Sequence, residues 1–130
     1  MKRLGNVIVF ARGEEVIDTL QRLGIDSAQI IAIGGFENAT IAYWNRETKQ
    51  YEDHVIAEQL EVVSLIGNIA RIGSEHKVHA HATLGRQDLS TIGGHLKRGV
   101  VYPTLEMMLI PLSPPLIRKR DEETGLDLLL

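Results

Sequence analysis

Hydrophobic and polar positions near the start of the chain predict one strand followed by one helix. Residues 6–11 form an apolar, β-branched run that is typical of a buried strand. Four apolar residues then recur at the spacing of a single helical face: Val16, Ile17, Leu20 and Leu23. Glutamates at 14 and 15 suit the first turn of this helix, and Gly24 is a typical helix end.

After residue 26 the pattern becomes that of strands. Short β-branched or alternating runs predict strands at 29–33, 40–44, 51–56, 60–66, 76–84, 92–96, 100–110 and 116–119. Residues 34–38 and 45–50 have the composition of turns, and glycines at 67 and 73 mark further breaks. Many short strands with one clear helix predict an α+β fold on a mostly antiparallel sheet. We expect one domain over residues 1–130.

Residues 77–84 alternate strictly between polar and apolar side chains. In a strand this alternation puts His79 and His81 on one face, opposite Val78 and Ala80, with their Cα atoms about 7 Å apart. A third imidazole, His95, follows two glycines that favour a bulge or a close backbone approach. If its strand lies beside the first, the three histidines converge.

Three convergent imidazoles predict a site for one divalent metal ion. The chain has no cysteine, so any metal must be held by His, Asp, Glu or backbone oxygen, and a set of imidazoles makes zinc the first candidate and another transition metal the second. Three protein ligands leave a coordination position open, as in sites that accept a ligand. The alternative is a set of surface imidazoles without metal, which is also how His54 and His76 are interpreted.

The net charge and the hydropathy pattern of the chain argue against two kinds of partner, DNA and membranes. The formal net charge is −3, and the basic run 118–120 is followed at once by three acidic residues, which argues against tight DNA binding. The apolar run near the N-terminus is too short for a signal peptide or a membrane span, so we expect a cytoplasmic protein without membrane contact.

Several blocks, in this order along the chain, resemble the plants and prokaryotes conserved (PPC) domain family: residues 31–39, 62–70, 79–82, 93–99 and 104–106. The Gly-Gly-His-Leu block at 93–96 is the most specific. The resemblance implies a seven-stranded, mostly antiparallel sheet with flanking helices and a homotrimer. It also implies a metal on His79, His81 and His95, and a DNA-binding label of the kind that free-standing prokaryotic members carry. The Arg-Gly-Arg-Pro AT-hook of the plant relatives is absent here.

Five further charged residues are candidates for the site. Glu61 and Glu106 interrupt apolar runs. Each accepts a hydrogen bond from a ligating imidazole or acts as a general base, or else is an outward-facing carboxylate or one paired at a subunit contact. Arg86, Lys97 and Arg98 flank the histidines and either attract a small anionic ligand or are solvated.

Two functions therefore remain open. The first is a PPC-family binding or regulatory domain, DNA-associated by family label, in which a metal orders a pocket. The second is a metal-dependent enzyme acting on a small anionic substrate. The leucine-rich tail at 126–130 adds a hint of assembly, because it packs either at a subunit boundary or on its own subunit.

Overall fold

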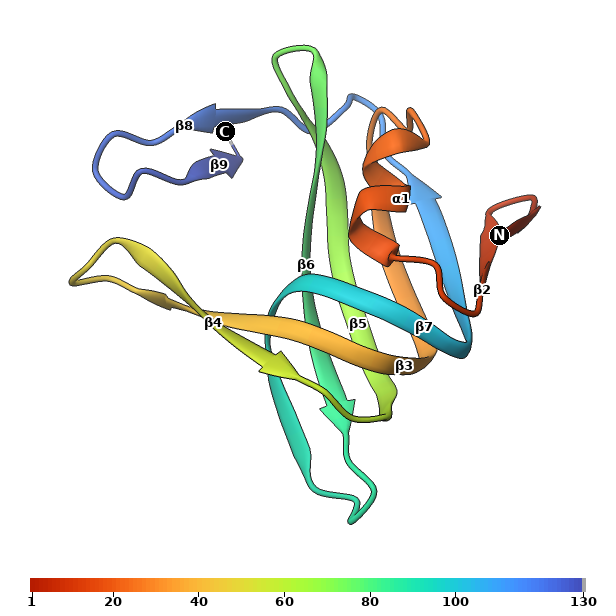
Figure 1. The fold of residues 1–130 in the computed structure, drawn as a ribbon. Coiled ribbons are helices and arrows are strands. Elements are labelled where there is room, and N and C mark those ends of the chain that lie inside the picture. The colour runs from red at the N-terminus through yellow and green to blue at the C-terminus, as the bar shows by residue number, and fades with distance from the viewer. Residues whose placement is uncertain (130) are drawn as a thin grey trace.

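The computed structural model describes residues 1–129, which form nine strands and a single short helix that packs against one side of the sheet (Figure 1). The elements are β1 (Lys2–Leu4), β2 (Val7–Ala11), α1 (Val16–Arg22), β3 (Ala28–Asn45), β4 (Gln50–Ile56), β5 (Leu60–Ile72), β6 (Glu75–Gly85), β7 (Thr91–Pro111), β8 (Arg118–Arg120) and β9 (Asp127–Leu129).

Seven strands form one antiparallel sheet in the order β1-β2-β7-β6-β5-β3-β4. The long strand β7 also pairs with β3, so β3, β5, β6 and β7 close into a ring of neighbours. Strands β8 and β9 form a separate hairpin that extends to the same side of the molecule as the β3–β4 hairpin (Figure 1). The histidine-bearing part of the sheet lies between these two hairpins.

The predicted turn at 34–38 is wrong, because β3 runs through it as one strand of 18 residues. Its two glycines are needed for close packing instead. A Cβ on Gly34 would lie 2.3 Å from the carbonyl oxygen of Thr104, and one on Gly35 would lie 2.2 Å from that of Tyr102. The predicted strands 92–96 and 100–110 likewise merge into β7, which bends around the sheet (Figure 1).

The prediction of an α+β fold with flanking helices is also wrong. The fold of residues 1–129 is dominated by its sheet, and α1, with seven residues, is the only helix. The side chain of Glu15 caps α1 by accepting hydrogen bonds from the backbone N–H groups of Ile17 and Asp18, and it accepts a third from Gly99 on β7.

The two faces of the sheet have different surroundings. One face packs with α1 into the core, which includes the fully buried side chains of Ile8, Phe10, Leu20, Ile30, Phe36, Leu65 and Met107. The other face leaves several large apolar side chains exposed. The leucine-rich tail contributes β9, which pairs with β8 of the same chain, while residue 130 lies outside the described residues. Within residues 1–129, no helix has the length and apolar character needed to cross a membrane.

Candidate metal centre

The pairing of β6 with β7 brings the three predicted histidines together. His81 lies directly opposite His95 in the register of these antiparallel strands, and His79 is two residues along β6 on the same face. Gly94 sits beside the backbone of Ala42, where a Cβ would come within 2.9 Å of a carbonyl oxygen. The glycine pair therefore allows β3 and β6 to approach β7 closely, just before His95.

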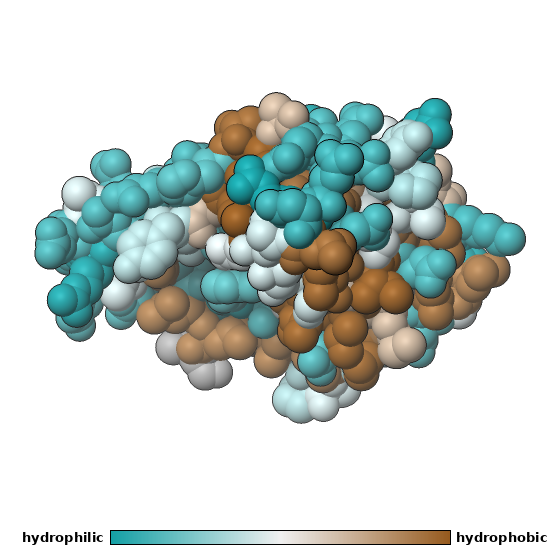
Figure 2. Space-filling view, turned by 90° about the horizontal axis from the view of Figure 1, so that it is seen from below, coloured by the Kyte–Doolittle hydropathy of each residue, from teal (hydrophilic) through white to brown (hydrophobic). Residues whose placement is uncertain are grey.

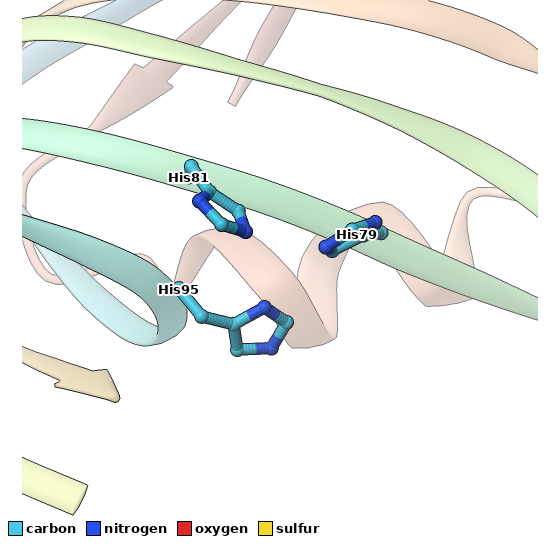
Figure 3. Close-up of side chains that lie close together, drawn as sticks. All are labelled: His79, His81 and His95. Atoms are coloured by element: carbon cyan, nitrogen blue, oxygen red, sulfur yellow. The ribbon is translucent and has the colours of Figure 1, made fainter. Parts of the chain in front are cut away.

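The three imidazoles surround one small space (Figure 3). Their ring centroids are 5.2 Å apart for His79 and His81, 5.3 Å for His79 and His95, and 5.6 Å for His81 and His95. One nitrogen of each ring can be chosen so that all three lie within 4.8 Å of one another. Nitrogens that lie this close could reach a single zinc ion at bond lengths of about 2.0–2.1 Å once the side chains adjust.

Burial keeps two of these rings in the form that binds metal. Desolvation, helped by the nearby His79 and His81, lowers the pKa of His95 to about 4. Burial, and after it the positive charge of Arg118, lowers the pKa of His79 below its ordinary value. Both rings are therefore mainly neutral near pH 7, with a lone pair available for a cation.

His95 also carries a polar atom that the protein itself does not satisfy. Its Nδ1 is buried and has no hydrogen-bond partner among residues 1–129, which is uncommon for a ring nitrogen. Tyr51 of β4 stacks on the ring at 4.6 Å between centroids and fixes its orientation, while Trp44 packs edge-on against Tyr51 at 5.0 Å. An oriented, neutral imidazole with an unsatisfied nitrogen fits the role of a metal ligand.

Arg118, which belongs to β8, lies against the His79 side of the histidine cluster. Its Nη2 donates to Oδ1 of Asn68 at 2.8 Å and lies 3.4 Å from Nδ1 of His79. Its Nη1 donates to the backbone carbonyl of Asp127 at 2.9 Å. Burial lowers the pKa of this guanidinium, with Asp127 and Tyr51 acting in the opposite direction. The C-terminal hairpin is thus tied directly to the histidine cluster.

Only one of the five charged candidates lies near the imidazoles. Lys97 is 5.1 Å from the centroid of the Tyr51 ring and pairs with Asp53 at 2.8 Å. The other four lie elsewhere. Arg86 pairs with Glu58, and Arg98 donates to Asn38. Glu61 and Glu106 line a separate surface pocket that contains none of the three histidines. Of the remaining histidines, His76 is 3.4 Å from Asp26 and His54 is exposed on β4.

Sequence reasoning missed Arg118, Tyr51 and Asn68. Arg118 belongs to a basic run that resembles solvated charge, and its burial depends on how the β8–β9 hairpin packs over β5 and β6. Tyr51 is the second residue of β4, a polar strand whose sequence gives no sign of a stacking partner. Burial alternates along residues 117–119 in the structure, with Ile117 and Lys119 exposed and Arg118 buried, but the sequence Leu-Ile-Arg-Lys at 116–119 does not alternate and gave no signal of it.

Comparison with known proteins adds a family and several solved relatives. The chain matches the model of the Plants and Prokaryotes Conserved (PCC) domain, abbreviated PPC above, over residues 5–113. A metal-containing protein from Archaeoglobus fulgidus is 33% identical, with a TM-score of 0.87 over 95% of this chain and 91% of that one. A PPC protein from Pyrococcus horikoshii is 32% identical, with a TM-score of 0.86 over 100% and 94%. A candidate DNA-binding protein from Bacteroides thetaiotaomicron is 29% identical, with a TM-score of 0.91 over 98% and 94%.

A curated relative is much longer than this chain. The bifunctional protein GlmU of Synechococcus sp. (strain JA-2-3B'a(2-13)) is 35% identical over 97 residues, which are 72% of this chain. The match spans 14% of that protein's length.

Proposed function

Because the chain belongs to the Plants and Prokaryotes Conserved domain family, we propose that it is a single-domain binding or regulatory member that holds one divalent metal ion and assembles as a homotrimer. The ligands are His79, His81 and His95, with zinc as the first candidate. The observation that carries the proposal is the convergence of three imidazoles from paired strands around an unsatisfied ring nitrogen. A relative described as metal-containing supports it. Three imidazoles leave the cation able to accept a further oxygen ligand.

Metal content tests this assignment directly. Replacing His81 by Ala removes one of three ligands and should reduce bound zinc from about one ion per chain to below about 0.1 after dialysis, measured by plasma mass spectrometry. His76→Ala is the matched control, because it lies on the same strand but outside the cluster. Equal zinc in the two variants would contradict the proposal.

The exposed sheet face supports the trimer. One cross-strand row passes over β1, β2, β7, β3 and β5 and ends at His81 on β6; its apolar members are Leu4, Val7, Met108, Ile31 and Ile66. Ile31, Ile66 and Met108 are 40%, 53% and 52% exposed. The view from below likewise shows broad hydrophobic areas at the surface (Figure 2). An apolar area of this kind is typical of a subunit contact, and it reaches a proposed metal ligand.

DNA binding is the property suggested by the relatives for which this chain offers the least physical support. Two solved relatives are described as candidate DNA-binding proteins, but the chain carries a net charge of −3. Within its basic run Arg118 is buried, and Arg120 lies 3.5 Å from Asp127. Few free cations are left there to neutralise phosphates.

We therefore expect weak binding to duplex DNA. Fluorescence anisotropy with a labelled 30-base-pair duplex at physiological salt should give a Kd weaker than about 10 μM, because little counterion release is available. The same titration at low salt controls for duplex quality. A sub-micromolar Kd at physiological salt would overturn this expectation.

A further inference from the structure

A small cavity adjoins the histidine cluster where the C-terminal hairpin crosses β6. Its volume is about 90 Å³, roughly that of three water molecules. His79 and His95 form the wall shared with the cluster. The full lining is Tyr51, Lys77, Val78, His79, His95, Arg118, Leu126, Asp127 and Leu128.

Arg118 brings a buried positive charge to this cavity. Its exposed fraction is only 6%, and its Nε is buried with no partner among residues 1–129. The acceptors it does have are uncharged: the Asn68 amide, a backbone carbonyl and the weakly engaged ring of His79. A buried guanidinium is ordinarily paired with an anion, because burying an uncompensated charge is costly.

The one carboxylate that lines the cavity is engaged elsewhere. Oδ2 of Asp127 accepts from Nζ of Lys77 at 2.5 Å, and Oδ1 lies 3.5 Å from Nη1 of Arg120. These contacts hold the pKa of Asp127 below its usual value, with the Lys77 hydrogen bond as the main lowering cause. The lining therefore has one more cation than anion even before a metal is bound.

The contact between Arg118 and His79 changes when a metal binds. A guanidinium can only donate, so Nδ1 of His79 accepts from Nη2 and the neutral ring carries its proton on Nε2. A metal on Nε2 requires the proton on Nδ1, where Arg118 cannot accept it. Metal binding through Nε2 and this contact exclude each other. Loading the cluster through Nε2 would free the N–H of Nη2 that faces His79, while the other N–H of Nη2 keeps its hydrogen bond to Asn68.

From these contacts we infer that the cavity is a binding site for a small oxyanion, a carboxylate or a phosphate, which the guanidinium of Arg118 recognises beside the metal. Nε and Nη2 lie on one edge of the guanidinium and suit two oxygens of a single anionic group. The position beside a cation and the release of Nη2 rest on the proposed function, whereas recognition through the unpartnered Nε does not. Arg118 is a ligand-binding residue in this assignment, and the β8–β9 hairpin forms part of the site.

Calorimetric titration with sodium acetate and with sodium phosphate tests the site, in chloride buffer of matched ionic strength, on metal-free and zinc-loaded protein. Wild type should bind one anion per chain, more tightly when zinc is present. Arg118→Met should weaken binding by about 10-fold or more, since charge-assisted hydrogen bonds are lost. Arg120→Met is the matched control, because its side chain is 68% exposed on the same strand. Acetate and phosphate arms distinguish a carboxylate from a phosphate preference.

Each outcome bears on a single claim. No anion binding by wild type, or equal affinities in wild type and Arg118→Met, would overturn the oxyanion site. If Arg118→Met does not fold by circular dichroism, Arg118→Lys replaces it, and unchanged affinity in that variant, which keeps the charge but loses the two-pronged donor, would equally overturn the site. If the protein takes up no zinc when zinc is supplied but still shows Arg118-dependent anion binding, the metal proposal is refuted and the anion site stands. Zinc binding without anion binding would refute the anion site and leave the metal proposal standing.

Discussion

Replacing Gly67 by alanine should lower the free energy of unfolding by about 3 kcal/mol or more, enough to leave much of the protein unfolded at 37 °C. Gly67 lies opposite Ala80 in the pairing of β5 with β6. A Cβ there would be 2.2 Å from the carbonyl oxygen of His79 and 2.7 Å from Cα of Ala80. Both obstacles are backbone atoms of β6, so relief requires the strand that carries His79 to move away.

Urea unfolding followed by circular dichroism measures this effect. Gly73→Ala is the control, because Gly73 has φ of +57° but no atom within 4 Å of an added Cβ. Gly73→Ala should lower the free energy of unfolding by only about 1–2 kcal/mol, because alanine is strained in the left-handed backbone conformation. The surviving folded fraction of Gly67→Ala should also bind zinc less tightly, because His79 is displaced. Similar free energies of unfolding for the two variants would contradict this prediction, because they would mean that β6 can move away from residue 67 at little cost.

Replacing Ile66 by Glu should convert the proposed trimer to a monomer. Ile66 is the last apolar member of the row, between Ile31 of β3 and His81 of β6. Burying such side chains contributes roughly 1.5–3 kcal/mol each, whereas burying an unpaired carboxylate costs several kcal/mol. Three copies of the charge would meet in one assembly, so dissociation is the expected outcome.

Light scattering coupled to size-exclusion chromatography decides this prediction. Wild type should show a mass about three times the 14.5 kDa of one chain, and Ile66→Glu the mass of one chain. Val55→Glu is the control, because Val55 is 75% exposed on β4, away from the row, and should leave the trimer intact. A monomeric wild type would remove the assembly from the proposal while leaving the histidine cluster unaffected.

The grouping of the histidines was predictable because it depends on local rules. Alternation along 77–84 fixes that His79 and His81 share a face, and the glycines before His95 indicate a close approach. That His95 faces His81 depends on the pairing of β6 with β7, which the sequence alone does not specify. The conclusion that these residues hold metal remains a prediction.

Other features depended on contacts between distant segments. Gly34 and Gly35 resemble a turn in sequence, but they serve a close crossing of β3 and β7 about 70 residues along the chain. The expected flanking helices came from the family resemblance, and α1 alone occupies that role in residues 1–129. Arg118 is buried only because the hairpin that carries it folds back over Asn68.

The most direct test of the central claim is anomalous diffraction at the zinc edge from crystals of the zinc-loaded protein. Our account predicts one strong anomalous peak per chain, within bonding distance, about 2.0–2.1 Å, of a nitrogen of each of His79, His81 and His95. It also predicts a further oxygen ligand on the side that faces Arg118. A peak at another position, or no peak in a chain whose three imidazoles keep the present arrangement, would contradict it.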